Sequence, residues 1–164
     1  MKLKTVDLSQ NDNRKILLKS ALFTRILDSW IDIKVPVSDL WDALVNVDSW
    51  GKWNSFIPVV EGKLTAGDRM KIKVLSPGMK EMTFEPTVYE IEKYKKISWG
   101  GGFLLFIYQG IHEFIFEEID DNTTRFRQIE KFQGPIVLLM NKMIRKTAVG
   151  YLNMNEELKY FLEH

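Results

Sequence analysis

Residues 108–133 read YQGIHEFIFEEIDDNTTRFRQIEKFQ, and this stretch decides the fold. Two runs of alternating apolar and polar residues, Leu105–Glu118 and Thr124–Phe132, flank the turn at residues 120–122. Alternation with a period of two is typical of a half-buried β-strand, and a short connection rich in Asp and Asn is typical of a β-hairpin. The stretch therefore predicts two long antiparallel strands that share one apolar face.

The hairpin also predicts which side chains meet across it. If the strands pair with Phe116 opposite Phe126, then His112 faces Glu130 on the apolar side of the sheet. A register change of two residues would instead place His112 opposite Gln128. Either register gathers polar groups among aromatic side chains.

Upstream of the hairpin, the same alternation recurs between turn residues. It predicts strands over Arg25–Val35, Val59–Leu64, Arg69–Leu75, Glu81–Glu92 and Lys95–Trp99. Pro86 interrupts one of these strands, which indicates a bulge or a sheet edge. The triplet Gly100–Gly102 predicts a flexible corner, and the residues after Pro36 predict a short helix.

Downstream of the hairpin, the period changes to that of a helix. From Gly134 to His164 apolar residues recur at spacings of three, four and seven, which predicts one long amphipathic helix of about 30 residues with a bend at Gly150. A sheet and a helix that each have one apolar face bury these faces against each other. The fold class is therefore α+β in two layers.

The first 23 residues lack a clear period. We expect an N-terminal extension over residues 1–23 with one short helix at Arg14–Leu22, followed by a single domain over residues 24–164.

Composition excludes several classes of function. The 164 residues carry 23 Lys and Arg against 22 Asp and Glu, so the chain lacks the basic excess typical of nucleic-acid binding. With no Cys there is no disulfide, thiolate metal site or cysteine nucleophile. Met1–Thr5 is not followed by a signal-peptide pattern, and no apolar run reaches the length of a membrane span. We expect a cytoplasmic protein without stable membrane insertion, as a monomer or weak homodimer.

Six strings in order resemble one family. They are WGKWNSFIP at 50–58, GKLTAGDRMKIKV at 62–74, MTFEPTVYEIEKYKKISWG at 82–100, HEFIF at 112–116, TRFRQIEKFQG at 124–134 and GYLNMNEELK at 150–159. Together they are similar to the START/birch-pollen-allergen (SRPBCC) superfamily, especially its polyketide cyclase/dehydratase-like branch.

The resemblance implies a helix-grip fold, in which a curved antiparallel sheet of about six to seven strands wraps around a long C-terminal helix. It also implies a cavity between them for a hydrophobic ligand such as a lipid, a sterol or an aromatic polyketide. The residues that we expect to contact this ligand are Trp53, Phe56, Met70, Ile72, Met82, Trp99, His112, Phe114, Gln128, Glu130, Met140, Met143 and Tyr151.

His112 and Glu130 are the candidate catalytic residues. A carboxylate among apolar side chains needs a partner, and a histidine supplies one. The pair would orient a ligand, transfer protons in a cyclisation or dehydration, or serve only as a satisfied structural pair. The sequence leaves all three open.

No cofactor or metal is expected. The glycines at Gly100–Gly102 lack the spacing of a dinucleotide motif, and His112 and His164 are the only histidines in the chain. The cations Lys142, Arg145 and Lys146 form either a solvated helix face or a contact for an anionic membrane.

Three functions follow. The first is a non-enzymatic binding protein or carrier for a small hydrophobic molecule. The second is a cyclase or dehydratase that uses Glu130 and His112. The third, implied by the Hsp90-activator relatives of the superfamily, is a protein-interaction module with an exposed apolar patch.

Overall fold

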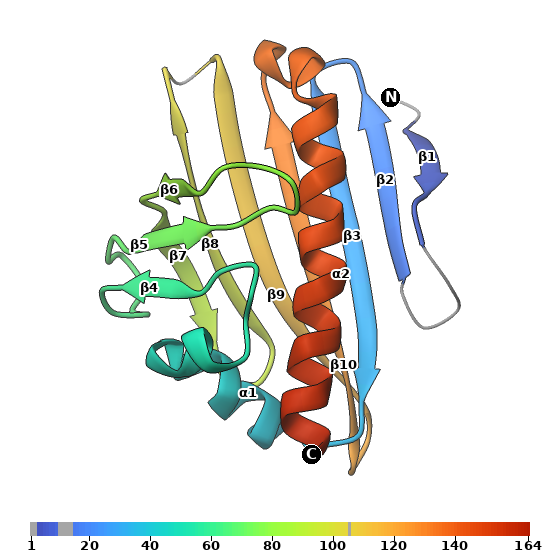
Figure 1. The fold of residues 1–164 in the computed structure, drawn as a ribbon, viewed down its shortest axis with the longest axis vertical. Helices are drawn as coiled ribbons and strands as arrows, with labels where there is room; N and C mark the ends of the chain where they lie inside the picture. Colours follow the sequence, from blue (N-terminus) through green and yellow to red (C-terminus); the bar gives the residue numbers. More distant parts are fainter. Residues whose placement is uncertain (1–2, 10–14, 105) are drawn as a thin grey trace.

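The fold has two layers, as Figure 1 shows. The computed structural model describes residues 3–9, 15–104 and 106–164. A seven-stranded antiparallel sheet forms one layer, and the long C-terminal helix α2 (Asn141–Glu163) crosses one face of it. A smaller sheet of three strands lies beside α2. This arrangement is the α+β helix-grip fold that the sequence predicts.

The large sheet has the strand order β1-β2-β3-β10-β9-β8-β7. Its strands are β1 (Lys4–Asp7), β2 (Lys15–Ala21), β3 (Thr24–Ile33), β7 (Thr87–Glu92), β8 (Lys96–Phe103), β9 (Tyr108–Asp120) and β10 (Thr123–Gln133). The pairing of β3 with β10 joins the beginning of the chain to its last strand. The long strands β3, β9 and β10 therefore occupy the middle of the sheet.

The remaining elements cover one side of this sheet. The small sheet contains β4 (Val59–Glu61), β5 (Lys71–Val74) and β6 (Met82–Phe84). The helical elements before α2 are α1 (Val37–Val45) and the 3₁₀ segments η1 (Val47–Lys52) and η2 (Pro135–Leu139). Pro36 and Pro135 stand at the starts of α1 and η2, where the missing backbone N–H of proline is tolerated.

The predicted hairpin register is confirmed. Phe126 pairs with Phe116, and Glu130 pairs with His112. The register shifts by one residue between Thr123 and Thr124, next to the turn, and the pairing is then regular from Thr124 to Gln133.

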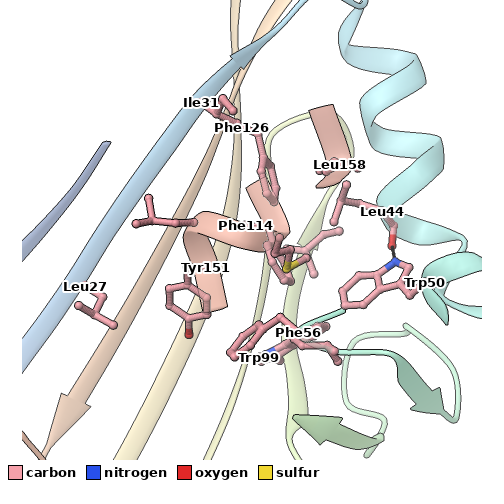
Figure 2. Close-up of a cluster of buried hydrophobic side chains, with 14 of the residues drawn as sticks. Leu27, Ile31, Leu44, Trp50, Phe56, Trp99, Phe114, Phe126, Tyr151 and Leu158 are labelled. Atoms are coloured by element: carbon pink, nitrogen blue, oxygen red, sulfur yellow. Dashed lines mark hydrogen bonds between the residues drawn. The ribbon is translucent and has the colours of Figure 1, made fainter. Parts of the chain in front are cut away.

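Aromatic side chains fill the core between the layers. Figure 2 shows this cluster, in which the indole of Trp50 donates a hydrogen bond of 3.1 Å to the Leu44 carbonyl. The ring of Phe114 packs edge-on against both Trp50 and Trp99, with ring centroids 5.9 and 4.9 Å apart. Edge-to-face contacts of this kind stabilise a core beyond the area that they bury.

The predicted helix at Arg14–Leu22 is wrong. Residue 14 lies outside the described residues, and Lys15–Ala21 is the strand β2, which pairs with β3. Ile16 and Leu18 are buried on the inner face. The first 23 residues thus contribute two strands to the large sheet.

Two further predictions need correction. The strand expected over Glu81–Glu92 divides at Pro86 into β6 and β7, which belong to different sheets. The Gly100–Gly102 triplet is not a corner but part of β8. A Cβ at Gly100 would lie 2.3 Å from the Gly110 carbonyl oxygen, so the close approach of β9 requires a glycine here.

Candidate functional site

A cavity of about 520 Å³ lies between the large sheet, the small sheet and α2. Most of its wall is apolar, and side chains from β5, β6, β8, β9, β10, η2 and α2 contribute to it. Cavities of about 300 to 1,000 Å³ hold drug-sized ligands. The space is therefore adequate for one small organic molecule.

Most of the residues predicted to contact a ligand surround this cavity. Those on its wall are Phe56, Ile72, Met82, Trp99, His112, Glu130, Met140, Met143 and Tyr151. Four others do not line it and belong to the buried interior instead: Trp53, Met70, Phe114 and Gln128. Phe114, for example, shares the inner face of β9 with His112 but lies deeper, among Trp50, Trp99 and Phe126.

Three polar side chains meet on the cavity wall. The Nδ1 atom of His112 lies 2.8 Å from Oε2 of Glu130 and 2.9 Å from the hydroxyl oxygen of Tyr151. The Tyr151 hydroxyl donates a hydrogen bond of 2.9 Å to the same Oε2 atom. Strands β9 and β10 place the first two residues opposite each other, and α2 brings Tyr151 from the other layer. We call these three residues the polar triad.

The geometry of the polar triad places one proton. An ionised Glu130 has only acceptors, so the close contact from His112 requires the hydrogen on Nδ1. The Nε2 atom of a neutral His112 ring then carries the lone pair, and this buried atom has no hydrogen-bond partner among the described residues.

Only one of the two Glu130 oxygens is used by the triad. Both bonds end on Oε2, and none to Oε1 is found within the described part of the chain. The Glu130 side chain keeps 12% of its surface exposed, against 5% for His112. Glu130 is therefore the triad member best placed to accept a hydrogen bond from a molecule in the cavity.

A second tyrosine lies near the same carboxylate. Gly110 on β9 leaves room for it, since a Cβ at Gly110 would lie 2.7 Å from the Tyr108 hydroxyl and 3.2 Å from Glu130 Oε1. Burial raises the pKa of Tyr108, and the charge of Glu130 raises it further. Burial also raises the pKa of Tyr151 well above its ordinary value, with the same contribution from Glu130. Both phenols therefore keep their protons at neutral pH, and the Tyr151 hydroxyl donates its proton to Glu130.

The exposed part of the wall includes two aromatic residues and one ion pair. Phe84 on β6 and Phe103 at the end of β8 are 42% and 50% exposed. Arg69 and Glu85 form an exposed pair, with Arg69 Nη1 3.9 Å from Glu85 Oε2. The cavity thus opens to solvent between β6 and the end of β8.

A separate polar group lies buried away from the cavity. Gln128 donates a hydrogen bond of 2.6 Å to Asn155, which donates one of 2.7 Å to Ser29. All three residues are buried, and none lines the cavity. This chain connects β10, α2 and β3, so it anchors the helix to the sheet.

Some residues of the cavity wall are not among those predicted from the sequence to contact a ligand. Tyr108 shares the face of His112 by simple alternation, and this signal was sufficient to find it. Phe84, Thr83 and Glu85 line the cavity only because β6 belongs to the small sheet, and a period-two pattern carries no information about which sheet a strand joins.

Among the described residues, no three His, Asp or Glu side chains are placed to hold a metal ion. Within the same part of the chain, no helix is long and apolar enough to cross a membrane.

Comparisons with known proteins agree with this fold. The family model for polyketide cyclase / dehydrase and lipid transport matches residues 25–157. No curated protein matches the chain.

Several solved structures share the fold at low sequence identity. Protein Ms6760 from Mycobacterium smegmatis is 17% identical, with a TM-score of 0.68 over 89% of this chain and 96% of that one. Norcoclaurine synthase from Thalictrum flavum, solved with dopamine and hydroxybenzaldehyde, is 11% identical, with a TM-score of 0.67 over 86% and 88%. A START superfamily protein from Mycobacterium smegmatis is 13% identical, with a TM-score of 0.61 over 84% and 97%.

Proposed function

Because the chain belongs to the polyketide cyclase / dehydrase and lipid transport family of the SRPBCC superfamily, we propose that it binds a small hydrophobic molecule in the cavity between the sheets and α2. The observation that carries the proposal is the cavity itself. A filled interior would have excluded a ligand, whereas about 520 Å³ lies within the range that small-molecule sites occupy.

The polar triad adds a preference for one kind of ligand. An apolar pocket gains its specificity from a few well-placed polar groups. Here the Oε1 atom of Glu130 offers one charged acceptor, while His112 and Tyr151 hold the other oxygen in place. A hydrophobic molecule that carries one hydroxyl or N–H donor satisfies this acceptor, and a pure hydrocarbon leaves it unpaired.

Native mass spectrometry of the gently purified protein tests this proposal. We expect a bound small molecule at one per chain, which denaturation and organic extraction release for identification. A protein that carries no molecule, and that also fails to bind any member of a panel of hydrophobic alcohols and phenols, would contradict the proposal.

A second candidate function is catalysis at the same site. It is favoured by the buried contact of a histidine, a carboxylate and a tyrosine on a cavity wall, because such groups transfer protons to and from a bound substrate. Glu130 would act as the base, and Tyr151 would act as a proton donor. Turnover of the extracted compound by the wild type, but not by Glu130→Gln, would support catalysis; equal turnover by both proteins would rule it out.

A further inference from the structure

Three turns of the chain meet at one end of the molecule, next to the opening of the cavity. The Gly134 N–H, at the start of η2, donates a hydrogen bond of 2.9 Å to the Phe23 carbonyl in the β2–β3 turn. The same glycine lies against the Ile107 carbonyl in the β8–β9 turn, because a Cβ at Gly134 would come 2.2 Å from that oxygen. Figure 1 shows these turns together at the upper end of the view, and we call this end the tip.

Large apolar side chains are exposed on all three turns of the tip. They are Leu22 (64%), Phe23 (46%), Leu104 (75%), Phe106 (86%), Leu138 (43%) and Leu139 (86%). Single exposed apolar residues are ordinary on a protein surface, but a contiguous patch of them marks an interaction site. Six such residues on neighbouring turns form a patch of this kind.

The backbone conformation at one of these positions does not favour the apolar residue found there. Leu104 has a φ of +45°, a region in which glycine or asparagine is more favourable than leucine. The chain therefore keeps an exposed leucine at a position where a polar residue would fit the backbone better.

The patch is adjacent to the cavity. Phe103, which lines the cavity, directly precedes Leu104, and Ile136, which also lines it, precedes Leu138 and Leu139 on η2. A surface that docks on the tip would therefore lie beside the cavity opening.

Two chain segments at and next to the tip carry no acidic residue. Residues 100–110 and 131–147 contain no Asp or Glu, but the second segment carries Lys131, Lys142, Arg145 and Lys146. None of these four cations forms an ion pair with an acidic side chain in the part of the chain that the structure describes. Unpaired cations beside exposed leucine and phenylalanine complement an anionic lipid surface, in which acyl chains lie directly below negative headgroups.

We propose that the tip is a docking surface for an anionic lipid bilayer. Phe106 and Leu139 enter the boundary between headgroups and acyl chains, Lys142 and Arg145 contact the headgroups, and the cavity opens toward the membrane. A hydrophobic ligand can then pass between bilayer and cavity without crossing water. Docking of the tip goes beyond ligand binding and can be measured without any ligand.

Flotation with vesicles tests the docking surface. The wild type is mixed with vesicles of equal parts phosphatidylcholine and phosphatidylglycerol, and separately with vesicles of phosphatidylcholine alone. We expect the protein to float with the anionic vesicles and to bind the neutral vesicles more weakly by about tenfold or more, since each cation near an anionic surface contributes to binding. Added salt should weaken binding to the anionic vesicles through screening.

Two variants identify the residues that dock. Phe106→Ser with Leu139→Ser removes apolar surface from side chains that are already exposed, so the fold is retained, and binding should fall about tenfold or more. The matched control is Ile119→Ser with Tyr160→Ser, which removes exposed apolar surface (51% and 69%) from the opposite end of the molecule. Circular dichroism verifies that both proteins are folded.

Each other outcome overturns the proposal. If the wild type stays at the bottom of the gradient with anionic vesicles, the tip does not dock on lipid. If the control variant loses binding as strongly as the tip variant, the contact lies elsewhere. If the wild type does not bind vesicles but forms a dimer or binds another protein, and the tip variant does neither, the patch is a protein interface. Native mass spectrometry reports on the cavity separately, so failure of docking and failure of ligand binding are distinguishable.

Discussion

The ring of Phe56 lies directly against the Cα atom of Gly150. A methyl carbon at position 150 would come 2.2 Å from Phe56 Cδ2, far inside van der Waals contact. Phe56 also packs edge-on against Tyr151, with ring centroids 5.3 Å apart, and lines the cavity. This one contact therefore sets the distance between α2 and the loop before β4, and with it one wall of the cavity.

Gly150→Ala should destabilise the protein although alanine is the better helix former. The change gains about 1 kcal/mol of helix propensity, but a methyl group forced against a buried ring costs about 1 to 3 kcal/mol. We expect a net loss of about 1 kcal/mol in urea unfolding. The control is Gly101→Ala, where the added methyl meets nothing within 4 Å. Phe56→Leu should restore part of the loss in the alanine variant, and an alanine variant more stable than wild type would contradict the contact.

Asp28→Asn should cost far more stability than Asp32→Asn, although both aspartates lie on β3 and both bind an arginine fork. The Asp28 side chain is 3% exposed and is bound by Arg127 and Lys19, whereas the Asp32 side chain is 47% exposed and is bound by Arg125. We expect a loss of about 2 kcal/mol for the buried site and of about 0.5 kcal/mol or less for the exposed one. Chemical denaturation of both variants at neutral pH makes the comparison.

The same buried aspartate predicts the response to acid. Burial by itself would raise the pKa of Asp28, but hydrogen bonds from Arg127 and Lys19 outweigh it and lower the pKa below its ordinary value of 3.8. A lowered pKa stabilises the fold above the ordinary value, and this contribution is lost as the pH falls through the lowered one. Stability of the wild type should therefore drop below pH 3.8, and the drop should be smaller in Asp28→Asn.

Alkaline pH should unfold the protein through its buried tyrosines. The pKa values of Tyr108 and Tyr151 are raised above the ordinary value of 10, chiefly by burial. The folded state thus holds these protons more tightly than the unfolded chain, so stability is full below pH 10 and falls above it by about 1.4 kcal/mol per pH unit for each tyrosine. Phenolate absorbance from these two residues should appear together with the loss of circular dichroism. Tyr151→Phe should remove one of the two contributions.

Glu130→Gln should abolish a preference for ligands that donate a hydrogen bond. Naphthol and its methyl ether have nearly the same shape, but only naphthol donates to Glu130 Oε1. We expect the wild type to bind naphthol about tenfold more tightly, as a hydrogen bond to a charged group is worth about 1.5 to 3 kcal/mol. The Gln128→Met variant is the control, because Gln128 lies two residues away on the same face but bonds to Asn155 outside the cavity. An unchanged preference in Glu130→Gln would mean that the carboxylate does not contact the ligand.

The part of the site that the sequence predicts is the part that one short turn controls. Alternation places His112 and Glu130 on the inner faces of β9 and β10, and the register shift beside the turn sets them directly opposite each other. The third member, Tyr151, lies on a predicted apolar stripe of the last helix. Its meeting with His112 depends on how far α2 is shifted along the sheet. The 3₁₀ segment η2 and the contact of Gly150 with Phe56 determine that shift, and neither has a signal in periodicity.

The errors have equally specific causes. In β2, Leu17 faces outward between the buried Ile16 and Leu18, so three consecutive apolar residues conceal the alternation of a strand. Pro86 looks like a bulge within one strand because residues on both sides of it alternate. The two halves in fact pair with β5 and β8 in different sheets, which only tertiary structure decides.

The pairing of β3 with β10 has a consequence for synthesis on the ribosome. About 90 residues separate these neighbouring strands in the chain. At about 5 to 20 residues per second, the inner edge of β3 waits roughly 5 to 20 seconds for its partner to be made. During that time the strand offers unpaired backbone groups and its buried side chains Leu27 and Ile31 to any other nascent chain. We expect this protein to fold late, because the sheet closes only after its last strand emerges. We also expect that chaperones which cover β-strand edges raise the yield of folded protein most when translation is slow.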